Sequence, residues 1–240
     1  MDGQSVGLDG TWMHVTAIIP ARDEEQAIGV VLDSLRALHQ QGRPLIDHII
    51  VVDNASSDDT AVVARGSGAT VVFEASLGYG NACLAGIRTI GTTDLVLFVD
   101  GDHSCDSADI PALLKAIGEG ADMAIGSRTL GHIEPHAMTR LQRWGTALVC
   151  RLMQLRTGIP VSDLGPLRAI RFDKLLELNM QDRRFGWTAE MQIKAYRRGL
   201  KVTEVPVKLR ARIGQSKISG TWRGTWLAAH DLLHVVLFSR

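Results

Sequence analysis

The chain lacks the sequence features that mark several classes of protein. Its 240 residues include only three cysteines, Cys83, Cys105 and Cys150, which are scattered and show no Cys-x-x-Cys spacing. A disulfide framework and a structural zinc site are therefore not expected, and a reducing compartment fits best. No run approaches the ~18 apolar residues of a membrane span. We expect a cytoplasmic protein whose contact with a membrane, where it occurs, is peripheral.

Charge of one sign and several nucleotide-binding motifs are also missing. Basic and acidic side chains number 26 each, which argues against a nucleic-acid binder. The first apolar run is followed by residues 20–23 (PARD). A dinucleotide-binding dehydrogenase would place Gly-x-Gly-x-x-Gly there, and a nucleotidyltransferase would place a glycine-rich basic loop there. The chain also has no P-loop and no Gly-x-Ser-x-Gly elbow.

What the chain does contain is an alternation of short apolar runs with longer segments of helical periodicity. The expected strands are 15–20, 48–53, 70–73, 95–100, 123–126, 167–170 and 202–209, and the expected helices are 24–40, 59–65, 81–90, 110–119, 138–156 and 188–198. This alternation predicts an α/β fold with a mostly parallel sheet flanked by helices. We expect one domain over residues 13–218, a tail at 1–12 and an amphipathic helix at 219–240.

Two aspartates follow the apolar run 96–99 (VLFV), in the order Asp100-Gly101-Asp102. A strand that ends in this way points both carboxylates at the carboxyl edge of the sheet, where open α/β sheets bind ligands. Magnesium is usually held by one or two carboxylates together with substrate phosphates. The alternative is a plain turn, but Asp106, Ser107 and Asp109 are better placed to cap the next helix. The pattern therefore predicts a Mg²⁺ or Mn²⁺ site that also receives a diphosphate.

Acidic residues also follow the first two expected strands. They lie in the segments 19–25 (IPARDEE) and 52–60 (VDNASSDDT). Carboxylates at this edge can accept hydrogen bonds from ribose hydroxyls and base N–H groups. The alternative is that Asp23, Ser57 and Asp58 cap the helices that follow. Acids at three strand ends of one edge favour a nucleotide site.

These segments, together with 100–102 (DGD), resemble the family 2 glycosyltransferases of GT-A fold. The similarity runs in the family's order from about residue 15 to 217, and the subgroup most similar is the polyprenyl-phosphate glycosyltransferases, which include the dolichol-phosphate mannose synthases. The resemblance implies a nucleotide-sugar donor, with Asp100 near donor and metal and Asp102 bound directly to the metal. The remaining donor-binding residues that it implies are Pro20, Arg22, Glu24 and Asp53.

The resemblance also assigns residues in the second half of the chain. Arg128 matches an arginine of the active centre, and Asp163 matches a residue that accepts hydrogen bonds from sugar hydroxyls. Glu190 stands where relatives that glycosylate hydroxyl groups place a catalytic base. The family's Arg-x-Gly-x-Ser-Lys segment matches Arg212, Ser216 and Lys217, which would close on the acceptor phosphate and donor diphosphate. Arginine suits phosphate because its planar fork makes two parallel hydrogen bonds.

The predicted activity is inverting, metal-dependent transfer of a hexose from UDP-glucose or GDP-mannose to a polyprenyl phosphate. A soluble sugar or small phosphate acceptor, a sugar nucleotidyltransferase and a binding module without activity remain alternatives. Amphipathic segments that carry Trp144, Trp222 and Trp226 could lie on a membrane or pack as core helices. The turn 78–81 (GYGN) could offer amides to a phosphate or could be a simple tight turn.

Overall fold

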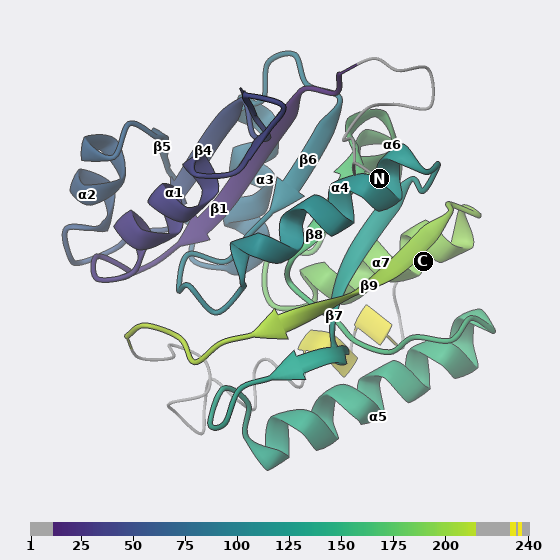
Figure 1. Cartoon of the computed structure of the whole chain (residues 1–240). Helices are drawn as coiled ribbons and strands as arrows, with labels where there is room; N and C mark the ends of the chain where they lie inside the picture. Colours follow the sequence, from purple (N-terminus) through teal and green to yellow (C-terminus); the bar gives the residue numbers. More distant parts are fainter. Residues whose placement is uncertain (1–11, 215–230, 234, 237–240) are drawn as a thin grey trace.

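The structure, a computed structural model, describes residues 12–214, 231–233 and 235–236. Within these residues the chain forms a single α/β domain built on a seven-stranded sheet (Figure 1). This confirms the fold class predicted from the sequence. Ser216, Lys217 and most of the predicted helix 219–240 lie outside the described residues, as does the predicted tail 1–12 apart from its last residue.

The strands of the sheet follow the order β5-β4-β1-β6-β8-β7-β9. Neighbours pair in parallel, except that β8 runs antiparallel to both β6 and β7. The strands are β1 (Val15–Ala21), β4 (His48–Asp53), β5 (Thr70–Phe73), β6 (Leu95–Phe98), β7 (Met123–Ile133), β8 (Arg168–Arg171) and β9 (Val202–Leu209), and a separate hairpin joins β2 (His39–Gln40) to β3 (Arg43–Pro44). The helices are α1 (Ile28–Arg36), α2 (Thr60–Gly66), α3 (Tyr79–Thr89), α4 (Ile110–Gly118), α5 (Arg140–Thr157), α6 (Phe172–Leu178) and α7 (Trp187–Arg197), with a 3-10 turn at Ser107–Asp109.

Helices cover both faces of the sheet, which explains why its strands are apolar along their length. On one face, Ile19 of β1 belongs to a buried cluster with Leu32 of α1 and Leu113 of α4. On the other face, the ring of Phe98 in β6 meets the ring of Trp187 in α7 edge to face, with centroids 6.1 Å apart. In Figure 1, α1 and α4 lie in front of the sheet and α3 and α7 behind it.

Helix α5 lies outside these two layers (Figure 1). A capping box at Thr139 begins it, and Gly158 in the left-handed conformation ends it. Its buried side chains, among them Met153, pack in a cluster with Ile193 of α7. Only one side of the helix is therefore used in packing against the domain.

The predicted helix 24–40 is much shorter in the structure, where α1 has nine residues. The amide of Glu24 donates to Thr60 Oγ1 at 2.8 Å, and the amide of Glu25 donates to Asp58 Oδ2 at 3.1 Å. These bonds hold the first residues of the predicted helix in a loop. The β2–β3 hairpin and α6 were not predicted.

Strand β7 is longer than the predicted strand 123–126. After a register shift, His132 pairs with Lys208 and Ile133 pairs with Leu209. This parallel extension of β7 and β9 needs a partner 76 residues away in sequence, so a local pattern could not reveal it. It leads the chain from the sheet to the start of α5.

The order of the strands creates a crevice at one edge of the sheet. β1 lies between β4 and β6, and it is parallel to both. The chain moves outward from β1 to β4 and β5, and then returns to place β6 on the other side. At such a switch point the connections diverge, so the carboxyl ends of β1 and β6 are left open to a ligand.

Candidate active site

The loops that follow β1 and β4 are fastened to each other. Asp23 Oδ1 accepts hydrogen bonds from the amide and the hydroxyl of Ser57, at 2.7 and 3.0 Å. Thr60 and Asp58 bind the amides of the β1–α1 loop in the same way. These hydrogen bonds hold the two loops together, and they involve side chains that the sequence offered as ligands or as helix caps.

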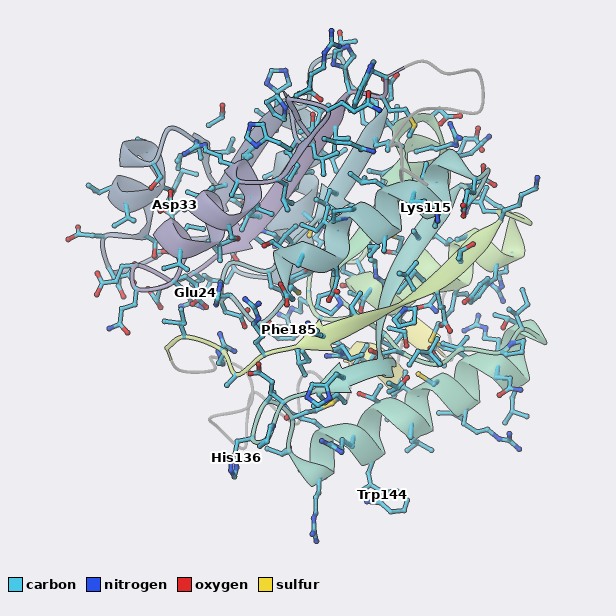
Figure 2. The ribbon with its side chains drawn as sticks, in the orientation of Figure 1. Glu24, Asp33, Lys115, His136, Trp144 and Phe185 are labelled. Carbon is cyan, nitrogen blue, oxygen red and sulfur yellow. The ribbon has the colours of Figure 1, made fainter. Side chains whose placement is uncertain are left out.

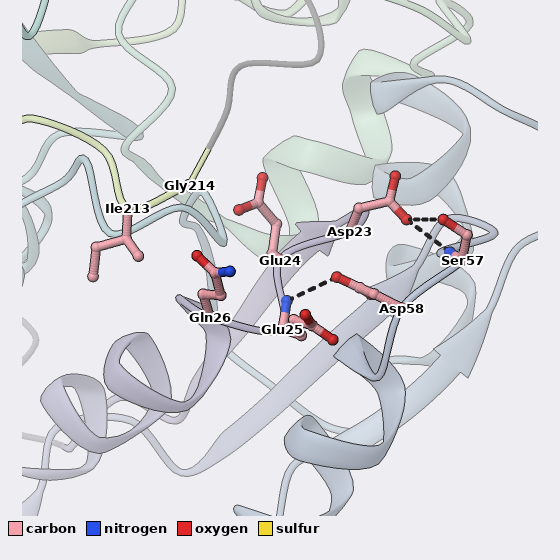
Figure 3. A pocket seen from close by; sticks show the side chains of 8 residues that line it. All are labelled: Asp23, Glu24, Glu25, Gln26, Ser57, Asp58, Ile213 and Gly214. Carbon is pink, nitrogen blue, oxygen red and sulfur yellow. Dashed lines mark hydrogen bonds between the residues drawn. The ribbon is translucent and has the colours of Figure 1, made fainter.

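These two loops enclose a pocket of about 380 Å³. Four of its lining side chains are acidic, and the segment after β9 closes one side (Figure 3). The lining residues are Asp23, Glu24, Glu25, Gln26, Ser57, Asp58, Ile213 and Gly214. The volume is in the range of small-molecule sites, and the carboxylates suit hydroxyl and N–H donors of a ligand.

The other predicted donor residues take different positions around these loops. Pro20 lies within β1, beside Val52 of β4. Asp53 is buried at the end of β4, and its Oδ1 accepts the amide of Ser56 at 3.0 Å. The side chain of Arg22 is half exposed, with Nε 3.9 Å from Asp23 Oδ2. Of these residues, Arg22 has the most freedom to reach a ligand.

A cluster of opposite charges adjoins the pocket. The guanidinium of Arg212 lies 3.1 Å from Glu24 Oε1 and 3.3 Å from Asp102 Oδ2. The amide of Ile213 donates to the carbonyl of Asp102 at 3.0 Å, which fixes the segment after β9 against the loop after β6. Arg212 Nε is buried and has no hydrogen-bond partner among the described residues. The fold thus leaves this N–H without an acceptor among the described residues.

Asp100 and Asp102 form the second part of the cluster. Asp100 Oδ1 accepts a hydrogen bond from the Tyr79 hydroxyl at 3.2 Å, and Asp102 Oδ1 accepts the amide of Ser104 at 2.9 Å. Burial, followed by the negative charge of Asp102, raises the pKa of Asp100 to about 7. Two carboxylates that repel each other at low dielectric gain most from a cation placed between them.

The donor set fits a divalent metal that is shared with a substrate. Among the described residues there is no group of three or more His, Cys, Asp or Glu side chains arranged to hold a metal by themselves. Asp100 and Asp102 thus supply two carboxylate ligands at most. Magnesium commonly takes one or two carboxylates and completes its shell with water and substrate phosphates.

Arg128 and Asp163 form a closed pair. Arg128 Nε and Nη2 lie 2.7 Å from Asp163 Oδ2 and Oδ1, and the Arg128 amide donates to Oδ2 at 2.8 Å. The amide of Leu164 donates to Oδ1 at 2.7 Å. A carboxylate has about four acceptor positions, and all four are filled. The resemblance implied that Asp163 binds sugar hydroxyls. Its contacts orient Arg128, and the sugar-binding role stays a prediction.

Glu190, which the resemblance placed at the position of a catalytic base, has several partners within the fold. Its carboxylate is buried and lies 2.7 Å from Lys194 Nζ. It also accepts the amides of Gln181 and Asp182, the latter at 2.7 Å. A carboxylate engaged in this way is not presented to a substrate as a base. Glu190 holds the loop between α6 and α7.

That loop docks on the amino end of α3. The amides of Gly80 and Asn81 donate to the carbonyls of Arg184 and Arg183, at 3.1 and 3.0 Å. A Cβ atom on Gly80 would lie 2.2 Å from the carbonyl oxygen of Asp182, so only glycine allows this approach. The turn is therefore a backbone contact, and these two amides are not open to a phosphate.

Two residues near the site were not predicted from the sequence. Tyr79 lies in the turn 78–81, and its hydroxyl donates to Asp100. Arg168, the first residue of β8, is fully buried and donates to the carbonyls of Gly165 and Thr188 at 2.7 and 2.6 Å. Burial lowers the pKa of Arg168 to about 10. The one sequence signal for a buried role was that this arginine lies within the predicted strand 167–170.

Comparison with known proteins places this chain in a family. A model of glycosyl transferase family 2 matches residues 16–178, which is more than half of the chain. The chain belongs to this family. It is therefore a glycosyltransferase, as its resemblance to these enzymes indicated.

Several relatives of this glycosyltransferase cover nearly its whole length. An uncharacterized glycosyltransferase of Mycobacterium tuberculosis is 36% identical, covering 92% of this chain and 97% of its own. The dolichyl-phosphate hexose transferase of Haloferax volcanii is 31% identical, covering 87% of this chain and 88% of its own. The undecaprenyl-phosphate mannosyltransferase of Micrococcus luteus is 30% identical, with 87% and 88% covered.

A solved structure shares the fold of this glycosyltransferase. Glucosyl-3-phosphoglycerate synthase from Mycobacterium tuberculosis, crystallised with Mn²⁺, uridine diphosphate and glucosyl-3-phosphoglycerate, superimposes with a TM-score of 0.74. The two are 24% identical, and the match covers 94% of this chain and 79% of the other. At this identity the likeness concerns the fold, which is the GT-A fold.

Proposed function

We propose that this glycosyltransferase moves a hexose from UDP-glucose or GDP-mannose to a polyprenyl phosphate, with inversion at the anomeric carbon and with Mg²⁺ or Mn²⁺ as cofactor. The observation that carries the proposal is the joined cluster of Glu24, Arg212 and Asp102, with Asp100 beside it, at the switch point of the sheet. The acidic pocket next to this cluster would take the nucleoside.

The charges of the cluster suit a donor diphosphate. Asp102, with Asp100 beside it, would hold the metal, which supplies charge neutralisation for the leaving nucleoside diphosphate when bound. Arg212 would turn its unpartnered Nε–H toward a phosphate oxygen. Arg128 in β7, whose Nε and Nη2 are held by Asp163, would offer its other guanidinium N–H groups to the phosphates. Positioned cations of this kind are a large term in reactions that develop negative charge on a leaving group.

The occupied carboxylate of Glu190 bears on the acceptor. A hydroxyl acceptor needs a base to remove its proton, whereas a phosphate monoester is already anionic near neutral pH. An oxygen of the acceptor phosphate would form a bond to the anomeric carbon while the bond from that carbon to the diphosphate breaks. No proton has to be removed from the nucleophile, so the lack of a presented base at Glu190 supports a phosphate acceptor.

The relatives named for dolichyl and undecaprenyl phosphate support a polyprenyl acceptor. A small phosphate acceptor is the second candidate, because a protein of the same fold is named for glucosyl-3-phosphoglycerate. Both candidates carry a phosphate group, and 3-phosphoglycerate, which has no lipid tail, also carries a hydroxyl and a carboxylate. Ser216 and Lys217 would join Arg212 at the acceptor phosphate in either case.

The test is a transfer assay with each donor, Mn²⁺ or Mg²⁺, and either detergent-solubilised polyprenyl phosphate or 3-phosphoglycerate. We expect product from the polyprenyl phosphate, loss of product with EDTA, and a fall of about a hundredfold or more in Asp102→Asn. Asp33→Asn, which removes an exposed carboxylate within α1 that is not part of the cluster, is the matched control. Full activity in Asp102→Asn would contradict the proposed site, and transfer only to 3-phosphoglycerate would replace the acceptor.

A further inference from the structure

Helix α5 exposes an unusual amount of apolar surface. Leu141, Trp144, Leu148 and Leu155 are between 56% and 78% exposed. They recur at three-, four- and seven-residue steps, so they share one side of the helix. Figure 2 shows Trp144 projecting from α5 away from the rest of the molecule. The opposite side of the same helix packs on α7 through Val149 and Met153. The packing of α5 against the domain thus does not use the exposed side.

The charge of α5 is of one sign. Its 18 residues, RLQRWGTALVCRLMQLRT, include four arginines and no aspartate or glutamate. Arg156 is used within the fold, where its Nη1 donates to the carbonyls of Val235 and Val236. The other three, Arg140, Arg143 and Arg151, are exposed. We call the four exposed apolar side chains and these three arginines the α5 outer face.

The α5 outer face is connected to the active site by a short path. Glu134, between β7 and α5, donates its amide to the carbonyl of Leu209 at 2.9 Å and accepts the amide of Ala211 at 3.0 Å. The next residue is Arg212, which contacts Glu24 and Asp102. In Figure 1, α5 begins on the side toward which β1 and β9 point their carboxyl ends. The start of the face, with Leu141 and Trp144, is therefore on the side of the molecule that carries the active site.

We propose that the α5 outer face docks on the surface of a bilayer that contains anionic lipids, and so presents the active site to an acceptor phosphate at that surface. This inference rests on the proposed polyprenyl-phosphate acceptor. An exposed tryptophan beside leucines suits the boundary between headgroups and acyl chains, and arginines without acidic neighbours are attracted to anionic lipid. Among the helices that the structure describes, none has the length and apolar content of a transmembrane segment.

A second copy of the chain fits this face less well. In a two-fold contact the same patch meets itself, so the arginines of one α5 would lie against those of the other. No carboxylate on either helix would offset that repulsion. An anionic lipid surface satisfies the apolar and the cationic side chains together.

The test measures vesicle binding by the whole chain without any donor, so its outcome does not depend on catalysis. Flotation would compare vesicles of phosphatidylcholine with vesicles of phosphatidylcholine and phosphatidylglycerol. The face is altered in Trp144→Ser/Leu148→Ser and, separately, in Arg140→Gln/Arg143→Gln/Arg151→Gln. The control is Val62→Ser/Leu176→Ser, which removes two exposed apolar side chains on α2 and α6. Thermal unfolding would check that each variant is folded.

We expect the wild type and the control to float with the anionic vesicles and to be released by high salt. Both face variants should bind the anionic vesicles at least about tenfold more weakly than the wild type. They should keep transfer to a detergent-solubilised, short-chain acceptor. Absence of binding by the wild type, or equal binding by the face variants, would overturn the proposal. So would a concentration-dependent dimer that the face variants abolish. If the wild type does not transfer a hexose to the detergent-solubilised acceptor, this result would instead count against the proposed function.

Discussion

The hydroxyl of Tyr79 donates a hydrogen bond to Oδ1 of Asp100 at 3.2 Å, and so joins the turn before α3 to the carboxylates after β6. The same turn receives the backbone of the loop that Glu190 holds. One carboxylate of the candidate metal site is therefore oriented by a tyrosine whose position depends on packing between the α6–α7 loop and the start of α3.

Removal of that hydroxyl should weaken the metal site without changing the fold. In Tyr79→Phe, Asp100 loses a donor that lowers its pKa and fixes its orientation. We expect the affinity for Mn²⁺ to fall by about tenfold, the size of one hydrogen bond to a charged group. Titration calorimetry would measure it. Tyr196→Phe, which removes a hydroxyl bonded to Gln192 on α7, is the control and should bind Mn²⁺ normally.

The raised pKa of Asp100 makes metal binding depend on pH. Below about pH 7 the carboxyl is protonated in the metal-free protein, so a bound cation must displace a proton. We expect the affinity for Mn²⁺ to rise between pH 6 and pH 8, with proton release that calorimetry in buffers of different ionisation enthalpy would detect. Affinity that stays flat over this range, or equal proton release at pH 6 and pH 8, would contradict the assignment.

The same group should affect the stability of the metal-free protein. Asp100 has a pKa of about 7 when folded, and an ordinary aspartate has about 3.9 when unfolded. Between these values the folded state binds the extra proton, so the contribution of this group to stability falls as pH rises from about 4 to 7. The difference in free energy of unfolding between Asp100→Asn and wild type, both in EDTA, should therefore favour the variant more at pH 8 than at pH 5. Denaturant unfolding at the two pH values would measure the difference.

Breaking the pair of Arg128 and Asp163 should lower the stability of the protein. Asp163→Asn would leave the guanidinium of Arg128 largely buried without its carboxylate. The loss of a partner from a buried pair typically destabilises by about 3–5 kcal/mol. Urea unfolding would measure this loss. The double variant Arg128→Met/Asp163→Asn should lose less stability than the sum of the two single variants. Strict additivity would mean that the two side chains do not act together.

Glu190→Gln should show which role this residue has. A catalytic base typically contributes about a hundredfold or more to the rate, and its loss removes a limb of the pH–rate profile. Because the Glu190 carboxylate is bound to Lys194 and to two amides, we expect lower stability with an unchanged pH–rate profile. Glu190→Gln/Lys194→Met should recover part of the stability, since no unpaired charge remains. A lost pH limb with normal stability would restore the catalytic role.

Several elements could be predicted because the information for them is local. The strands 48–53, 70–73 and 202–209 have the predicted bounds, since apolar runs of that length are typical of strands in a covered sheet. The helix at 24–40 was predicted too long because side chains more than 30 residues away bind its first amides. β7 was predicted too short because its extension is stabilised only by β9.

The sequence by itself determined the α/β architecture, the family and the clustering of acidic residues at one sheet edge, because periodicity and residue order carry that information. Only the tertiary structure decided which charged groups are occupied and which remain available. Asp163 and Glu190 are saturated by partners, whereas Arg212 reaches Glu24 across 188 positions and keeps an unpartnered N–H. The physical reason is that hydrogen-bond saturation depends on distances between side chains far apart in the chain, and only folding sets those distances.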